Sequence, residues 1–378
     1  MKILHVADTH LGFSAYRKLT EDGKNQREVD VYDAFNQCVD YAVKSKPDLV
    51  LHAGDLFDSV RPTNRAITVA IQQILRLSQE KIPFVVISGN HETPKLKETG
   101  NILTIFEHLD FVYPIYNNGY ETISFEIDDK KITIHAISQC GTKKDFNDNL
   151  KEVDIDSSSD FNIFMAHGAV TGIKEFKMNE FNELFIPTNT FAKNFDYIAL
   201  GHYHKYTELR KNAFYSGSTE NLTFSDIGGK KGFLEIEPDK KMRHTFIEVN
   251  TRPMIDAPCI DCSNLSIEEV VKNIKDTIRK IEPKGKIFRI RLVNIPSHIY
   301  RGIDFNQIRD LSKGSVHFEI KSDVLKEEES QISENYKIES IAGEFEKYLR
   351  KQQLPDKEVL LKLGLEYIQK VESKDEGK

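Results

Sequence analysis

The feature that most constrains the fold is a series of short apolar runs, several of which stop at Gly, Asp or Asn. These runs, rich in Val, Ile, Leu or Phe, are KILHVAD, DLVLHAGD, PFVVISGN, KITIHAIS, FNIFMAHG and DYIALGH. Such segments are typical of β-strands. Helical patterns separate the early runs, as in YDAFNQCVDYAVKS and NRAITVAIQQILRLSQE, so an α/β sandwich with buried strands is predicted over the first 250 residues. The later runs have fewer helices between them, which favours a second, mixed sheet.

A chain of 378 residues is too long for one ordinary core, so more than one domain is expected. The stretch NTRPMIDAP around Pro253 is predicted to be a boundary. After it, the helical SIEEVVKNIKDTIRKI, the strand-like KIFRIRLVNI and a second helix–strand pair predict a small α+β domain over residues 251–323. The charged LKEEESQISE and two short amphipathic patterns predict an acidic linker with two helices over residues 324–378.

Composition narrows the class of protein. Hydrophobic content of 39% and charged content of 29% are typical of a soluble globular chain, and no apolar run reaches membrane-spanning length. The N-terminal MKILHVADTH lacks the organisation of a signal peptide, so we expect an intracellular protein of the cytoplasm or nucleoid. Cys259 and Cys262 form a single CxxC without a second pair at zinc-finger spacing, and we interpret them as incidental reduced thiols.

Polar residues cluster at the carboxyl ends of five predicted strands, where open α/β sheets place their sites. They are Asp8 and His10, then Asp55, then Asn90 and His91, then His167, and finally His202 and His204. In GHYHK the two histidines are two positions apart, so on an extended chain they would point to the same side. One such residue usually just caps or turns a strand. Five strand ends together, with two D/H-x-H pairs, instead predict a metal site.

The donor atoms of this set favour a particular class of ion. All are oxygen or imidazole nitrogen, which favours manganese, iron or zinc at an open catalytic site. The set is too large for one ion, and two ions sharing a carboxylate would use it fully. Asp55 is the best candidate for the shared ligand, since a bridge needs two charged oxygens. A water activated by such a pair is a nucleophile near neutral pH.

The order of these blocks resembles a known signature. D-x-H, G-D, G-N-H-[DE], H and G-H-x-H follow one another as in the calcineurin-like metallophosphoesterases. The flanking HVADTHLG, GDLFDSVRP, GHYHK and FYSGSTENLTFSD closely resemble the SbcD-type DNA double-strand-break repair nucleases, including the archaeal and eukaryotic branch. The resemblance covers residues 1 to about 250 strongly, and TRPM at the boundary fits it too. It implies a β-sandwich flanked by helices, a capping domain and a C-terminal helical tail.

The resemblance also implies roles for single residues. Asp8, His10, Asp55 and His204 would hold one manganese ion, and Asp55, Asn90, His167 and His202 would hold the other. His91 would not bind metal but would orient the phosphate and protonate the leaving oxygen. The implied activity is manganese-dependent exonucleolytic and endonucleolytic cleavage of DNA.

Two positions depart from the family pattern. Asp58 stands where many members carry a histidine that is thought to help set the exonuclease geometry, which puts the efficiency or direction of digestion in doubt. Glu92 replaces the commoner aspartate, and GNHE is also the spelling found in protein phosphatases.

Three other functions compete with the nuclease. A protein serine/threonine phosphatase normally carries an arginine after its second block, but GDLFDSVR has Ser59 there. A small-molecule or cyclic-nucleotide phosphodiesterase would use the same metal core. A non-catalytic scaffold with structural metals is disfavoured by the full ligand set together with His91.

The expected partners are DNA, an ATPase and a second copy of the chain. The net charge of the chain is −7, but nine Lys or Arg against three acids between Arg279 and Lys313 give a local +6 suited to a DNA backbone. The loop AYRKLTEDGKNQRE could rest on DNA or be solvated.

By resemblance, the tail helices would bind the coiled-coil base of an SbcC-type ABC ATPase, although they could instead fold back on the nuclease. Their predicted apolar faces are Ile338, Ile341, Phe345 and Leu349, then Leu360, Leu363, Tyr367, Ile368 and Val371. A homodimer is implied through helices that follow the second and third blocks. Ile102, Leu103 and Phe106 are candidates for that contact, or for packing on their own sheet.

Overall fold

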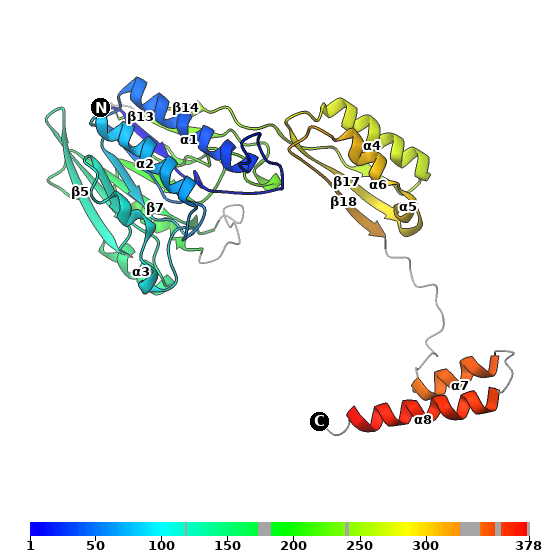
Figure 1. Ribbon diagram of the computed structural model, residues 1–378. Coiled ribbons are helices and arrows are strands. Elements are labelled where there is room, and N and C mark those ends of the chain that lie inside the picture. The colour runs from blue at the N-terminus through cyan, green and yellow to red at the C-terminus, as the bar shows by residue number, and fades with distance from the viewer. Residues whose placement is uncertain (118, 173–182, 239–241, 326–340, 352–356, 376–378) are drawn as a thin grey trace.

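The computed structural model describes residues 1–117, 119–172, 183–238, 242–325, 341–351 and 357–375. Two six-stranded sheets pack face to face near the N-terminus, a smaller sheet follows, and a pair of helices ends the described chain (Figure 1). The predicted α/β class and β-sandwich are confirmed.

The first sheet has the strand order β14-β13-β1-β2-β3-β4. Its parallel part is β1 (Ile3–Val6), β2 (Leu49–His52), β3 (Phe84–Ile87) and β4 (Val112–Ile115), and its antiparallel part is β13 (Gly232–Glu237) and β14 (Arg243–Glu248). β1 therefore lies between β2, the next strand along the chain, and β13, which comes after all the strands of the second sheet.

The second sheet is mixed, as predicted, with the order β11-β12-β10-β7-β6-β5. Its bounds are β5 (Tyr120–Ile127), β6 (Lys130–Ile137), β7 (Phe161–His167), β10 (Tyr197–Gly201), β11 (Thr207–Arg210) and β12 (Ala213–Tyr215). The four central strands are parallel, and the edge strands β5 and β11 run antiparallel to their neighbours. Two short strands, β8 (Ala169–Val170) and β9 (Phe185–Ile186), pair separately.

Three helices cover the outer faces of the sandwich. α1 (Gln26–Ser45) and α2 (Asn64–Gln79) lie over the first sheet, and α3 (Lys143–Glu152) packs on the second. Side chains of Asn25 and Thr63 cap the first two helices by accepting backbone N–H bonds, which satisfies donors that a helix start leaves unpaired. α1 begins earlier than the quoted helical pattern, because Asn25 supplies the cap within the expected loop.

The core has layers on both faces of the first sheet. Ile3 and Leu49 pack between the sheets, while Leu4 and Val50 pack under the helices. All four residues of β1 are buried, which explains why the strand reads as a continuous apolar run. His5 is buried too and bonds across the sandwich through Nδ1 to the Tyr197 hydroxyl, 2.8 Å away.

The candidate dimer residues belong mostly to this core. Leu103 and Phe106, in the 3-10 helix Ile102–Phe106, are fully buried and contact the layer under α1 and α2. For these two side chains the structure supports packing on their own sheet, because a side chain without exposed surface cannot contact a second copy. Ile102 is half-buried.

The small sheet has a core of its own. Its elements are β15 (Met254–Asp256), β16 (Ile260–Asp261), α4 (Ile267–Ile281), β17 (Ile287–Pro296), α5 (Ser297–Gly302), α6 (Phe305–Leu311) and β18 (His317–Leu325). Val270, Ile274 and Ile278 of α4 pack on Phe288 and Ile290 of the central strand. β15, β16 and α5 were not predicted, being too short for a periodic pattern, and β18 ends two positions beyond Asp323.

Arg252, just before this sheet, joins it to the sandwich. Its Nε and Nη2 donate to the two carboxylate oxygens of Asp30 on α1 at 2.6 and 2.5 Å, and its Nη1 donates to the Gly285 carbonyl at 2.6 Å. Nearby, the Tyr16 ring stacks on His317 with centroids 3.7 Å apart. Tyr16 thus contacts the small sheet, while Arg17 and Lys18 beside it are exposed, and contact of this loop with DNA stays a prediction.

The tail forms a helical hairpin of α7 (Ile341–Lys351) and α8 (Lys357–Asp375). Leu349 and Leu361 are buried, and Phe345 lies so close to Gly364 that an added Cβ atom would be 2.2 Å from its ring. Leu363 and Tyr367 nevertheless keep 48% and 68% of their surface exposed. Ile338 and the linker LKEEESQISE after its first residue lie outside the described residues.

None of the helices in the described part of the chain combines the length and apolar character needed to cross a lipid bilayer. All four cysteines are free thiols, and only Cys259 is exposed.

Candidate metal centre

The carboxyl ends of strands from both sheets meet at one end of the sandwich. β1 leads into Asp8 and His10, β2 into Asp55, and β3 into Asn90 and His91. From the second sheet, β7 ends at His167 and β10 leads into His202 and His204, with His167 and Gly201 paired in register. The structure thus brings together every residue that the sequence nominated for the site.

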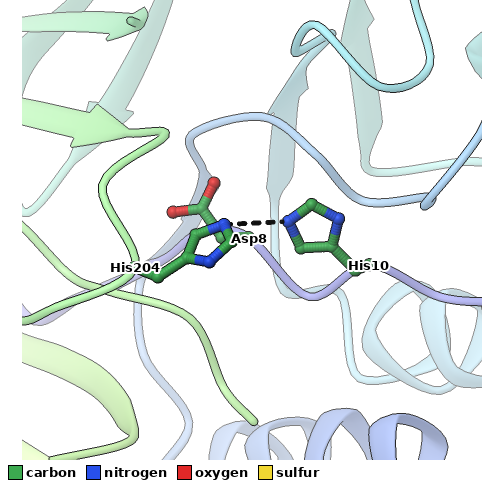
Figure 2. A group of neighbouring side chains, drawn as sticks. All are labelled: Asp8, His10 and His204. Atoms are coloured by element: carbon green, nitrogen blue, oxygen red, sulfur yellow. Dashed lines mark hydrogen bonds between the residues drawn. The ribbon is translucent and has the colours of Figure 1, made fainter. Parts of the chain in front are cut away.

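One group consists of Asp8, His10 and His204 (Figure 2). The Nε2 atoms of the two histidines lie 3.3 Å apart, and all three residues are buried. One ligand atom of each residue lies within 4.8 Å of the others. Two imidazole nitrogens and a carboxylate at this spacing could hold a divalent ion.

A second group surrounds Asn90. Its Oδ1 lies 3.0 Å from His167 Nε2 and 3.2 Å from His202 Nδ1. His167 Nε2 is also 3.2 Å from Asp55 Oδ2, while Nδ1 donates to the Ala53 carbonyl at 2.9 Å. Because a carbonyl oxygen only accepts, the proton of neutral His167 is on Nδ1, and Nε2 presents its lone pair to the group.

Asp55 lies between the two groups and fits a shared ligand. It appears with His10 and His91 in one candidate cluster and with Asp8 and His167 in another. Its Oδ1 accepts the His91 backbone N–H at 3.0 Å, whereas its buried Oδ2 has no hydrogen bond of good geometry from a described residue. A buried carboxylate oxygen without a donor is costly unless a cation occupies its lone pairs, so these residues fit a metal centre.

Charge within the site follows from this crowding. Burial opposes ionisation of Asp55, but the neighbouring His167 and His91 outweigh it and hold the pKa of its carboxyl well below the ordinary value. Burial likewise opposes protonation of His167, yet Asp55 and Asp8 raise its pKa to about 9. The metal-free site therefore retains protons that a bound cation would displace.

His91 differs from the aspartate and histidine ligand candidates in its exposure. It is half-buried, and its ring lies edge-on to His10 with centroids 4.6 Å apart. Its Nδ1 donates to the backbone carbonyl of Asp58 at 3.0 Å. Nε2 is then the nitrogen that can exchange a proton with a bound group.

Four nominated residues have a left-handed backbone. The φ angles are 52° for Asp8, 46° for His10, 54° for Asp55 and 105° for His202. Residues other than glycine rarely adopt such angles, and they concentrate at functional sites where the surrounding structure imposes them. Gly89 meets a related demand, because a Cβ atom there would lie 2.2 Å from Asp55 Oδ1.

The glutamate of the GNHE motif, Glu92, has a structural role in the loops around the site. Its carboxylate accepts the backbone N–H groups of Phe57 and Gly89, each at 3.0 Å, so it ties the loop after β2 to the loop after β3. It is fully buried, and burial together with the charge of Asp55 raises its pKa to about 8.

Sequence reasoning missed two carboxylates that contact ligand candidates. Glu183 Oε1 lies 3.0 Å from His202 Nε2, and Asp226 Oδ1 lies 3.3 Å from His204 Nδ1. Asp226 belongs to FYSGSTENLTFSD, so its family context was a usable signal. Glu183 has no pattern around it. His5, His52 and His135 belong to β1, β2 and β6 themselves and are buried, and His52 Nε2 lies 3.1 Å from the Thr9 hydroxyl.

Comparison with known proteins agrees with this geometry. The profile of the calcineurin-like phosphoesterase family matches residues 1–206. The DNA double-strand break repair protein Mre11 of Methanococcus maripaludis is 27% identical over 376 residues, covering 94% of this chain and 92% of that protein. Its counterpart in Thermoplasma acidophilum is 33% identical over 237 residues, covering 60% and 58%. An SbcCD nuclease subunit of Staphylococcus epidermidis is 29% identical over 370 residues, covering 89% and 92%.

Proposed function

Because the chain belongs to the calcineurin-like phosphoesterase family, we propose that it is a manganese-dependent DNA nuclease of double-strand-break repair. The observation that carries the proposal is the convergence of Asp8, His10, Asn90, His167, His202 and His204 around Asp55 at the strand ends of both sheets. The names of the similar proteins, a DNA double-strand break repair protein and a nuclease subunit, support DNA as the substrate. With DNA as its substrate, the enzyme would act in the cytoplasm or nucleoid.

Two manganese ions would divide the seven ligands. Asp8, His10 and His204 would hold one ion, and Asn90, His167 and His202 the other, with Asp55 shared. Donor chemistry supports the choice, since oxygen and imidazole ligands without thiolate suit manganese. When bound, the ions would supply Lewis acidity at the phosphodiester and a water of lowered pKa.

The chain's own residues would do the remaining chemistry. The ligands would set the net charge of the occupied site. Its positive electrostatic potential would orient a phosphodiester group of DNA toward the half-buried His91. His91 Nε2 would protonate the leaving oxygen, while the Asp58 carbonyl holds the opposite edge of the ring through Nδ1. Because His91 is half-buried whereas the aspartate and histidine ligand candidates are buried, a substrate can reach its ring.

We further propose that residues 1–250 are the nuclease domain, 251–323 a DNA-binding capping domain, and 324–378 a linker with ATPase-binding helices. The separate core of the small sheet supports this division. On that sheet Arg289 is bound to Asp256, with Nη2 2.7 Å from Oδ2, and it stacks over Phe224 of the sandwich. Arg291 is 43% exposed and is the better candidate for a phosphate contact.

The exposed apolar face of α8 supports the proposed ATPase contact. Leu360, Leu363 and Tyr367 keep 44% or more of their surface exposed, although the hairpin buries Leu349 and Leu361. A helix face of this kind can lie in an apolar groove of a partner. A homodimer is also proposed, with contacts other than Leu103 and Phe106.

One set of assays separates the nuclease from its rivals. Labelled duplex DNA, a phosphopeptide and cyclic AMP would each be incubated with the protein and manganese, or with manganese and excess chelator. We expect chelator-sensitive cleavage of the duplex and at most trace hydrolysis of the other two. Turnover of the phosphopeptide or of cyclic AMP without DNA cleavage would replace the nuclease by a phosphatase or a phosphodiesterase. Inactivity on all three, with tight metal binding, would favour a scaffold.

A further inference from the structure

The two histidines of GHYHK present opposite ring nitrogens to the site. His202 directs Nδ1 to Asn90 Oδ1 at 3.2 Å, and its Nε2 lies against Glu183 Oε1 at 3.0 Å. His204 directs Nε2 to His10 at 3.3 Å, and its Nδ1 lies against Asp226 Oδ1 at 3.3 Å. Each ring is thus held between the site on one edge and a carboxylate on the other.

The chemistry of the pair decides which nitrogen can bind a cation. A neutral imidazole carries one N–H and one lone pair, and an ionised carboxylate accepts hydrogen bonds but donates none. A hydrogen bond from His202 Nε2 to Glu183 therefore leaves the lone pair on Nδ1, which faces Asn90. A ring with its proton on Nδ1 would turn an N–H toward the cation instead and could not be a ligand.

The backbone contacts of His202 do not orient its imidazole ring, so a side-chain contact from another segment is needed to do so. Its φ of 105° is far from the common regions, and its N–H is bound to both carboxylate oxygens of Asp8 at 2.9 and 3.1 Å. These bonds fix the main chain but not the rotation or tautomer of the ring. Glu183, only 6% exposed, comes from the segment before β9 rather than from a ligand-bearing loop.

We propose that Glu183 is a positioning residue that fixes the tautomer and rotation of His202 and thereby the cation affinity of the Asn90–His167–His202 group. A carboxylate behind a ligating histidine typically changes metal affinity ten- to a hundredfold. Asp226 occupies the corresponding place behind His204, but it also accepts the backbone N–H groups of Leu222 and Thr223. Glu183 is therefore the cleaner of the two to test. The inference rests on the proposed two-ion site.

The first experiment needs no metal. In the chelator-treated protein labelled with 15N-histidine, the His202 ring is expected as the Nε2–H tautomer, assigned by comparison with His202→Ala. Glu183→Ala should convert it to a mixture of tautomers, and the isosteric Glu183→Gln should restore Nε2–H, because an amide oxygen still accepts. Glu152→Ala, an exposed change on α3, is the matched control. An unchanged His202 tautomer in Glu183→Ala would overturn the proposal.

The second experiment assigns the effect to one group by titrating manganese chloride calorimetrically. Wild type should bind two ions, and His204→Ala should weaken the ion that Asp8 and His10 share. Glu183→Ala should weaken the other ion by about ten- to a hundredfold, and Glu183→Gln should recover most of that loss. Equal weakening of both ions in Glu183→Ala, with a lowered melting temperature, would reduce Glu183 to a structural ion pair. Failure of wild type to cleave DNA would refute the proposed function while leaving the tautomer result intact.

Discussion

His10 Nδ1 lies 3.1 Å from the carboxylate oxygen Oδ1 of Asp58. The residue that replaces a common family histidine thus accepts a hydrogen bond from one of the candidate ligands. Because the proton of neutral His10 is then on Nδ1, its Nε2 lone pair faces His204 and the site. At this position the chain therefore has a carboxylate that orients a candidate ligand.

Asp58→Ala tests this relationship. Loss of the acceptor should weaken manganese binding by about ten- to a hundredfold and slow DNA cleavage, whereas Asp58→Asn should retain much of both because its amide oxygen still accepts. The backbone carbonyl that holds His91 is present in both variants. Calorimetry and a duplex-cleavage time course measure the two effects. Equal affinities for wild type and Asp58→Ala would show that His10 does not depend on Asp58.

Asp55→Ala should remove the ligand shared by both groups. We expect weaker binding of both manganese ions and loss of DNA cleavage by at least about a hundredfold. Asp110→Ala, at an exposed position of the same sandwich, is the control for a lost carboxylate. If calorimetry still detects two ions of wild-type affinity in Asp55→Ala, Asp55 is not the bridge.

His91→Ala should separate metal binding from catalysis. His91 is not assigned as a ligand, so the variant should bind two manganese ions while cleavage falls by roughly a hundredfold or more, the usual contribution of a general acid. His108→Ala changes an exposed histidine outside the candidate metal centre and outside the proposed capping domain, and it should cleave DNA normally. Full activity on duplex ends in His91→Ala would remove this residue from the mechanism.

The tail should be dispensable for cleavage and necessary for the ATPase. Truncation after Leu325, where β18 ends, should leave manganese-dependent nuclease activity intact and abolish co-purification with the ATPase. A finer variant, Leu363→Asp with Tyr367→Asp, changes exposed positions only and spares the hairpin core at Leu361. Burying each large apolar side chain contributes about 1.5–3 kcal/mol, so this double change should also break the complex. Glu366→Ala on the same helix is the control, and wild-type binding by the double variant would place the contact elsewhere.

His5 predicts a dependence of stability on pH. Burial lowers the pKa of its imidazole to about 3, and Nδ1 accepts from the Tyr197 hydroxyl. Below about pH 6.5 the unfolded chain binds a proton that the folded chain excludes, so the folded state loses about 1.4 kcal/mol per pH unit as pH falls toward 3. Above pH 6.5 this contribution is constant.

Denaturant unfolding in chelator, at pH 7.5 and pH 5, checks the prediction. His5→Gln cannot titrate at this position. As pH falls from 7.5 to 5, its free energy of unfolding relative to that of wild type should therefore rise by about 2 kcal/mol. A difference that does not change with pH would contradict the exclusion of the proton.

The sequence could predict which candidate ligands come together, because each of them follows a strand. Asp8, Asp55 and Asn90 come directly after apolar runs, and parallel strands bring their carboxyl ends to one edge. Glu183 could not be found in this way, because it reaches His202 from a segment whose own sequence has no periodicity. The short β15 and β16 escaped for a related reason, since two or three residues cannot establish a pattern and pairing with β17 alone makes them strands.

In the tail, the sequence pattern predicts that a helix forms, whereas tertiary contacts determine which of its residues are buried. The spacing of Phe345 and Leu349 predicted a helix, and a helix is present. Which residues it buries could not be read from that spacing, because Gly364 decides where α7 approaches α8.

The position of β1 has a consequence for how the protein is made. Ile3 pairs with Ile236, so the N-terminal strand waits for a neighbour that leaves the ribosome only after the whole second sheet. Pairing over such a sequence separation is slow and leaves β1 with an unpaired edge meanwhile. Asp8 likewise gains its contact with His202 only after more than half of the chain has been made. A nascent chain that has not yet reached His202 and His204 therefore carries no assembled metal centre, whatever part of the first sheet has already formed.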